Sequence, residues 1–407
     1  MSDPIISPWR GLMILLALAH IVGTVGYISV MAMAPLIRVD LNLNATQVGS
    51  FMSAFYVALA ISALPAGLWV DRIGVGRGLA LSMGFMAMGA LGFAIADGYL
   101  TAVLATFVMG VGYGLVNPAT AKGVLDGFGP KERATAMGVK QMGVPIGGLL
   151  AAGVGAGTSY YSWRDAMIGA AVFTGLVGVA WWLRRGPKSE VISVGPMLLW
   201  TNFYADLRAI LANANMRAVN FAGFNFNMSQ QSISTYLTLF LRDVAGASQP
   251  VASLCLGGAQ VASAVGRVLW ALISDRRNSG RRKGVLILAM ALGTGGCFLS
   301  ITVGPGWSLP FLLALASLSG VTILAYAPML HTICAEVVEP RLAGSAIGSN
   351  LLATSIGGTI GPLIFGVLID WTGGYSVSWL MTGLVIFFGV FALAIGLRED
   401  QDSKSLS

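Results

Sequence analysis

Two basic residues lie deep within long apolar stretches of this sequence, Lys140 in GVKQMGVPIGG and Arg267 in GRVLWALISDRR. A Lys or Arg at the centre of a membrane helix costs about 2.5–3.5 kcal/mol on insertion scales, so it needs either a function or a side chain that reaches back to water. Lys140 comes seven residues after Arg133, and Arg267 comes eight residues before Asp275. At a rise of 1.5 Å per residue, both cations lie about 10–12 Å from the same membrane face. We therefore expect them at matching depth.

No acidic residue of the sequence can neutralise these two cations within the membrane. All 17 Asp and Glu residues fall in loops, in tails or at the ends of apolar stretches. Two cations that face one space repel each other unless an anion lies between them. A substrate can supply that charge, with Arg267 forking onto a carboxylate and Lys140 acting as a point charge. The alternative is that each side chain merely extends to the nearer surface.

Further polar residues recur on single faces of the apolar stretches, where they contact either a substrate or a neighbouring helix. His20 is the candidate for proton coupling, because its reference pKa near 6.5 lets modest changes switch its charge. Without a buried carboxylate, coupling runs through His20, through the acid group of the substrate, or is absent. Ordinary hydrogen bonds between helices are the alternative for each residue. The candidate substrate-binding residues beside Lys140 and Arg267 are His20, Tyr27, Asn117, Asn227, Gln231 and Gln260.

The composition predicts a membrane protein. Of the 407 residues, 56% are hydrophobic and 10% are charged, against roughly 25% charged in a typical soluble domain. The net charge of +7 comes from basic residues in short loops and gives no reason to expect nucleic acid. The three cysteines have neither paired nor ligand-like spacing, and the sequence carries no metal cluster, phosphate loop or nucleophile motif. We expect no cofactor, no metal and no enzymatic activity.

Helix breakers divide the chain into twelve apolar stretches, each long enough to cross a hydrocarbon core about 30 Å thick. With both termini in the cytoplasm, 18 of the 24 Lys and Arg residues lie on that side and three lie outside, as the positive-inside rule requires. Lys122, Lys140 and Arg267 fall within spans, and Lys122 can pair with Asp126 one turn away. The expected spans are 11–36, 47–70, 78–96, 100–122, 135–157, 165–183, 218–240, 250–274, 284–303, 308–334, 342–369 and 375–397.

The two sets of six spans repeat each other. The segment DRIGVGR at 71–77 matches DRRNSGR at 275–281 with an offset of 204 residues. Seven further positions match at an offset of 210, among them Pro118 with Pro328. At that offset Lys140 corresponds to Asn350, a neutral hydrogen-bonding counterpart that joins the candidate substrate-binding residues.

The segment GLWVDRIGVGR resembles the signature loop between helices 2 and 3 of the major facilitator superfamily, and SDRRNSGRRK resembles its echo between helices 8 and 9. The resemblance covers essentially the whole chain. It implies an all-α membrane protein with the major facilitator fold, twelve transmembrane helices in two pseudo-symmetric six-helix bundles. It also implies that Asp126 pairs with Arg133 and Glu336 with Arg341. The residues that it places in gating or structural roles on the cytoplasmic face are Asp71, Arg72, Arg77, Asp126, Arg133, Asp275, Arg276, Glu336 and Arg341.

Arg267 stands where organic-anion members of the superfamily, such as the oxalate/formate exchanger and the monocarboxylate transporters, carry a substrate arginine in helix 8. This local resemblance does not extend to Lys140, because the second cation of the exchanger lies in helix 11. Thr106 stands where proton antiporters of the superfamily usually carry an arginine in helix 4. This departure counts against an antiporter.

These observations predict a secondary transporter that carries a small organic anion, a mono- or dicarboxylate, by alternating access, either coupled to protons or as an exchanger. An efflux transporter for amphipathic drugs is the nearest alternative, and a non-transporting membrane sensor is another. The predicted parts are an N-terminal bundle at 1–183, a cytoplasmic linker with an amphipathic helix at 184–217, a C-terminal bundle at 218–397 and a tail at 398–407. Expected partners are the anionic substrate, a co-transported proton and the lipid of a bacterial inner membrane, and the chain is expected to be a monomer.

Overall fold

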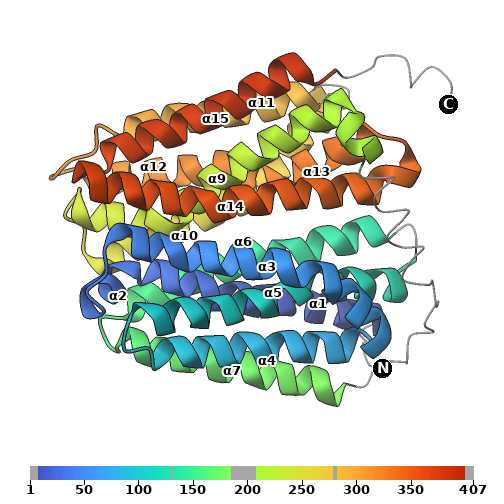
Figure 1. The fold of residues 1–407 in the computed structure, drawn as a ribbon, viewed down its shortest axis with the longest axis horizontal. Helices are drawn as coiled ribbons and strands as arrows, with labels where there is room; N and C mark the ends of the chain where they lie inside the picture. The colour runs from blue at the N-terminus through green and yellow to red at the C-terminus, as the bar shows by residue number, and fades with distance from the viewer. Residues whose placement is uncertain (1–7, 130–131, 185–207, 278–281, 399–407) are drawn as a thin grey trace, which may run out of the picture.

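The computed structural model contains two groups of long helices that lie side by side (Figure 1). It describes residues 8–129, 132–184, 208–277 and 282–398. The first half comprises α1 (Pro8–Ala32), α2 (Ala34–Asp40), α3 (Ala45–Ile73), α4 (Val75–Ala94), α5 (Tyr99–Gly127), α6 (Arg133–Gly157) and α7 (Trp163–Leu183). The second half comprises α9 (Ala214–Asp243), α10 (Gln249–Arg277), α11 (Arg282–Ser300), α12 (Leu309–Thr322), α13 (Ala327–Glu336), α14 (Ala343–Thr372) and α15 (Ser376–Gly396).

Within the described residues, eleven spans are long and apolar enough to cross a membrane, with α12 and α13 counted together as one. The twelfth expected span is α9, which is 30 residues long but carries many Asn, Gln, Ser and Thr side chains. Most of these side chains are buried between helices, so the low hydropathy of α9 reflects its place inside the bundle. The predicted all-α membrane fold is therefore confirmed. The predicted amphipathic helix of the linker falls mainly on residues 185–207, which lie outside the described residues.

Helix α1 begins and helix α15 ends at the same end of the bundle, which we call the terminal end; the opposite end is the distal end (Figure 1). The two halves meet mainly where α3 packs on α14 and α6 packs on α10. Small residues allow this close approach, since a Cβ atom on Gly49 would collide with the carbonyl oxygen of Pro362. A Cβ atom on Gly148 would likewise fall 2.5 Å from the side chain of Gln260.

A set of polar contacts, which we call the distal latch, joins the halves at the distal end. Asp370 of α14 accepts hydrogen bonds from the backbone N–H groups of Ala45 (2.9 Å) and Thr46 (2.8 Å) and from the Thr46 hydroxyl (2.6 Å). The carboxylate thereby caps the first turn of α3, where free N–H groups and the helix dipole favour a negative charge. Arg38 of the first half pairs with Asp243 of the second at 2.7 Å.

Further hydrogen bonds between described residues of the two halves extend the distal latch towards the middle of the bundle. The Tyr236 hydroxyl donates to the Ala45 carbonyl at 2.8 Å, and the Ser53 hydroxyl donates to the Thr359 carbonyl at 2.6 Å. At the terminal end, the ion pairs between described residues stay within one half: Lys122 with Asp71 and Asp126, and Arg282 with Asp275 and Glu336. The structure therefore holds the halves together distally.

The tenth span is not the continuous helix expected at 308–334. Helix α12 ends at Thr322, a single 3-10 turn covers Ile323–Ala325, and α13 starts at Ala327. Pro328 explains the break, because proline has no N–H to donate to the carbonyl of Leu324 one turn earlier. That carbonyl is therefore available to donors from a neighbouring helix.

We predict that Asp370→Asn weakens the distal latch. The amide removes the negative charge from the N-terminus of α3 at a cost of about 1 kcal/mol, since the site is partly exposed. Spin labels at Tyr160 and Ser308, both exposed and on opposite halves at the distal end, should report longer distances in this variant by pulsed electron paramagnetic resonance. Asp40→Asn is the matched control, because Asp40 pairs with Arg164 within one half. Identical distance distributions for Asp370→Asn and the unsubstituted chain would contradict this role.

Candidate functional site

Lys140 is buried where α6 crosses α1. Its side chain lies in the first half, and the residue is 3% exposed. Glycines allow α6 to approach α1 closely, since a Cβ atom on Gly143 would lie 2.6 Å from the Ala17 carbonyl oxygen and 2.7 Å from the His20 side chain. Gly143 therefore serves close packing between the two helices. This packing brings Lys140 next to polar side chains of α1 and α5.

Thr120 of α5 joins Lys140 to His20. Lys140 Nζ donates to Thr120 Oγ1 at 3.1 Å, and His20 Nε2 lies 3.0 Å from the same oxygen. The Thr120 hydroxyl is close enough to donate to the Val116 carbonyl at 2.7 Å, which leaves its oxygen free to accept from both neighbours. His20 Nδ1 is buried and has no hydrogen-bond partner among the described residues. We call His20, Thr120 and Lys140 the buried triad.

Arg267 lies on α10 in the second half and contacts the broken tenth span. Its Nη2 atom is 3.4 Å from the Leu324 carbonyl, the group left free by Pro328, and the Ser263 hydroxyl donates to the same oxygen at 2.9 Å. Arg267 Nε is buried and has no partner among the described residues. A guanidinium has five N–H donors, so most of its hydrogen-bonding capacity stays available for an anion.

Tyrosine side chains from both halves lie near Arg267. Tyr27, Tyr113 and Tyr326 all lie within electrostatic range of the guanidinium. The Tyr27 ring packs against Phe55 with centroids 4.3 Å apart and against Tyr113 at 5.3 Å. Tyrosine rings offer apolar faces and hydroxyl groups together, so they suit the body of a small organic molecule whose charged group meets Arg267.

Lys140 and Arg267 lie at the same level on facing helices. Helices α6 and α10 run antiparallel, since Gly148 contacts Gln260 and Gly155 contacts Ser253. Continuing this register towards the terminal end sets Lys140 opposite Val268 and next to the level of Arg267. The register therefore agrees with the matching depth inferred from the sequence.

The other candidate residues separate into two groups. Asn227 donates to the Thr354 carbonyl at 2.7 Å and accepts from Gln231 at 3.1 Å, and it also interacts with Tyr56 of the first half. These amides lie between the halves, as does Gln260 against Gly148. Asn350 instead donates to Val219 and Asn220 within the second half. The Asn117 side chain is exposed, and no contact of it with the buried triad is found in the described part of the chain.

The expected ion pairs of Asp126 with Arg133 and of Glu336 with Arg341 are wrong, because each acid pairs with a different basic residue. Asp126 pairs with Lys122 at 3.7 Å, because one helical turn separates them, while Arg133 donates to the carbonyls of Leu125 and Phe128 at the end of α5. Lys122 also reaches Asp71 at 3.2 Å and so connects α3 with α5.

The second half shows a similar exchange of partners at the terminal end. Glu336 pairs with Arg282 at 3.0 Å, and Arg282 also holds Asp275 at 3.0 Å. Arg341 lies beside Glu339 at 2.8 Å, only two residues away along the chain. Arg72, Arg77 and Arg276 are exposed at the terminal end, with no ion pair to another described residue.

Several residues of the site were missed from the sequence. Thr120 gives no signal of its own, since a threonine in a membrane helix usually bonds to the preceding turn. Tyr113 and Tyr326 could have been found as aromatic residues that shortly precede Pro118 and Pro328, and these two prolines match in the repeat. Asp370 was assigned only to a span end, and its contact with α3 depends on how the halves meet.

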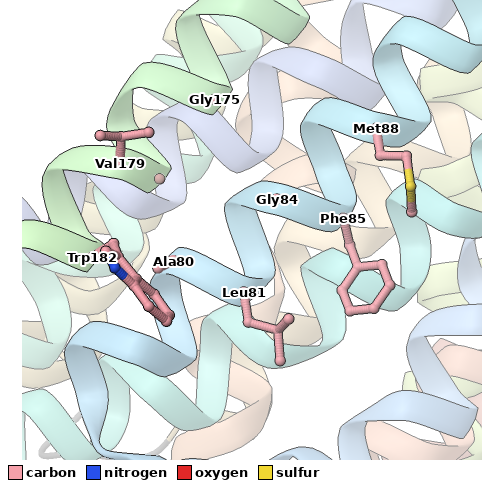
Figure 2. Close-up of a pocket in the computed structure, with 9 residues that line it drawn as sticks. Ala80, Leu81, Gly84, Phe85, Met88, Gly175, Val179 and Trp182 are labelled. Atoms are coloured by element: carbon pink, nitrogen blue, oxygen red, sulfur yellow. The ribbon is translucent and has the colours of Figure 1, made fainter.

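A surface hollow lies away from these polar residues, between α4 and α7 (Figure 2). It is lined by apolar side chains, including Leu81, Met88, Val179 and Trp182. Large exposed hydrophobic residues are common on the outside of this bundle, so lipid chains are the natural occupants of such a groove. It offers no group that could recognise a charged molecule.

Comparisons with known proteins agree with this architecture. The model of the Major Facilitator Superfamily matches residues 15–310 and 219–407. The hexuronate transporter of Bacillus subtilis is 25% identical over 91% of this chain and 91% of that protein, and the probable sulfoacetate transporter of Cupriavidus necator is 23% identical over 93% and 91%. A solved bacterial homologue of the human lysosomal transporter Spinster, in an inward-facing and occupied conformation, shares the fold with a TM-score of 0.77 and 17% identity over 96% of this chain and 97% of that one. The chain thus belongs to the Major Facilitator Superfamily of secondary transporters and is not an enzyme.

Proposed function

We propose that this chain transports a small organic anion bearing a carboxylate, which binds between Arg267 and Lys140. The observation that carries the proposal is the presence of two cations at one level on facing helices, one in each half, without a carboxylate partner among the described residues. An anion between the halves would attract both cations and reduce the net positive charge there. Because it would contact both halves, it is held during their rocking motion.

The chemistry of each cation supports a carboxylate as the anionic group. Arg267 has a buried Nε without a partner, and a guanidinium fork matches the two oxygens of a carboxylate. Lys140 donates one of its three N–H groups to Thr120, which leaves two for an anion. Two relatives are named as transporters of hexuronate and of sulfoacetate. Both of these molecules carry a carboxylate, which agrees with this choice.

The positive-inside rule supports a cytoplasmic location for the terminal end. The distal latch would then close the outer side of the bundle, and the structure would correspond to an inward-facing state. In this state the substrate exchanges with the cytoplasm, and opening of the distal latch starts the return to the outward-facing state.

An efflux transporter for lipophilic cations fits the site less well. Arg267 and Lys140 would repel a cation, and the described spans hold no acid near them to offset this. A panel of hexuronates, aldonates, aromatic carboxylates and dicarboxylates should raise the melting temperature of the purified protein, whereas tetraphenylphosphonium should not. Uptake of the stabilising carboxylate into proteoliposomes then tests transport. Stabilisation by tetraphenylphosphonium alone would contradict the proposal.

We predict that Arg267→Lys lowers uptake of the stabilising carboxylate about tenfold or more, because a lysine cannot make the two parallel hydrogen bonds of a guanidinium. Arg267→Gln should abolish uptake. Arg217→Gln is the matched control, because Arg217 is exposed and, among the described residues, donates to the Leu211 and Ala212 carbonyls at the terminal end. Initial rates in proteoliposomes check this. Equal rates for Arg267→Gln and the control would rule out the assigned role.

We predict that Thr120→Val raises the dissociation constant of the carboxylate about five- to tenfold, because loss of one hydrogen bond to a charged group costs about 1.5–3 kcal/mol, partly recovered by relaxation. The valine has nearly the same shape but leaves Lys140 without its partner. Thr120→Ser keeps the hydroxyl and should bind like the unsubstituted chain. Isothermal titration calorimetry measures both constants. If serine and valine are equally weak, the effect comes from packing and not from the hydrogen bond.

A further inference from the structure

Lys140 holds an unbalanced charge when no anion is bound. The residue is 3% exposed, and the hydroxyl of Thr120 is its hydrogen-bond partner among the described residues. A neutral hydroxyl cannot offset the charge of an ammonium group. A buried charge without an opposite charge is costly, so the state of Lys140 depends on whether an anion is present.

Within the described residues, the helices packed against Lys140 bring no acid towards it. Helix α1 contributes His20, whose Nε2 shares the Thr120 oxygen. Helix α10 contributes Arg267 at the same level. On α5 the nearest charged residue along the chain is Lys122, which already pairs with Asp71 and Asp126 at the terminal end. The neighbours of Lys140 are thus cationic, able to become cationic, or neutral.

The two cations differ in how they can respond when the anion leaves. Arginine keeps its proton under all ordinary conditions, whereas a lysine in a buried site can lose its proton and become a neutral amine. Loss of one proton from Lys140 would halve the uncompensated charge between the two halves. The empty protein could then pass between its two states without carrying a second bare cation through the closed bundle.

From this arrangement we infer that Lys140 carries one proton together with each anion, so that the chain works as an anion–proton symporter. The amine lone pair takes a proton from water on the side where the anion binds, which forms the N–H bond of an ammonium. After the anion leaves on the other side, that N–H bond breaks and the proton passes to water there. This inference rests on the proposed transport of a carboxylate and adds the group that couples it to protons.

Thr120 suits both protonation states of Lys140. Its oxygen accepts a hydrogen bond from the ammonium, as the 3.1 Å distance indicates. When Lys140 is a neutral amine, the hydroxyl can turn from the Val116 carbonyl and donate to the amine nitrogen instead. His20 lies on the other side of this hydroxyl, where its Nε2 atom at 3.0 Å can orient Thr120.

The experiment measures proton movement directly. Proteoliposomes filled with the pH-sensitive dye pyranine receive the carboxylate that gave the largest thermal shift, with D-glucuronate as the first probe. In the unsubstituted chain, uptake should acidify the interior by about one proton per labelled anion. Lys140→Arg keeps the positive charge but cannot release its proton. In this variant the proton influx per labelled anion should fall about tenfold, whatever rate of anion uptake remains.

Two variants serve as comparisons. Lys283→Arg makes the same substitution at a lysine that donates to the Ala394 and Leu397 carbonyls, away from the site, and should leave proton influx unchanged. His20→Gln should keep the ratio of protons to anions of the unsubstituted chain. If proton influx per anion falls in His20→Gln but not in Lys140→Arg, His20 is the proton carrier and the inference is overturned.

The outcomes separate the two proposals. Anion uptake by the unsubstituted chain without acidification overturns the inference about Lys140 and leaves the proposed function standing, whether or not Lys140→Arg folds. If no member of the carboxylate panel is taken up, the proposed function fails, and the inference fails with it. Acidification that persists unchanged in a folded Lys140→Arg protein also overturns the inference.

Discussion

A backbone carbonyl that loses its helical partner inside a membrane must find another donor, because no water replaces it there. Pro328 deprives the Leu324 carbonyl of its helical donor, and Ser263 and Arg267 of the neighbouring helix donate hydrogen bonds to it instead. The break in the tenth span therefore fixes where the guanidinium lies. It also sets Tyr326 within range of Arg267, so one proline positions the charge and one of the rings around it.

The fold follows from the sequence because its signals are long and repeated. Apolar stretches of about 20 residues leave helices as the main way to satisfy the backbone in lipid. Duplicated motifs group them six and six. Residues at the span ends were harder to assign, because Asp126, Arg133, Glu336 and Arg341 each had several partners within reach of a flexible side chain. Asp126 forms an ion pair with Lys122, which lies one turn away on the same helix, as the i,i+4 spacing favours.

The candidate site was predictable only in part. Lys140 and Arg267 stood out because charge is rare in these spans, and the register of α6 on α10 agrees with the depth inferred from residue counts. Thr120 did not stand out, since its importance comes from helices that meet at one hydroxyl. Asn350 took a structural role with Asn220. Its equivalence to Lys140 in the repeat reflects position in the fold and not shared chemistry.

The two cations come from different places in the duplicated sequence. Lys140 corresponds to Asn350 at an offset of 210, and Arg267 corresponds to Ala63 at an offset of 204, so neither charge has a charged copy in the other half. A molecule between the halves therefore meets a compact ammonium on one side and a planar fork on the other. An elongated solute turned end for end would meet a different pair of groups. If the solute binds between these two groups as proposed, the site has a built-in polarity, and each passage of the solute would begin from a single preferred orientation.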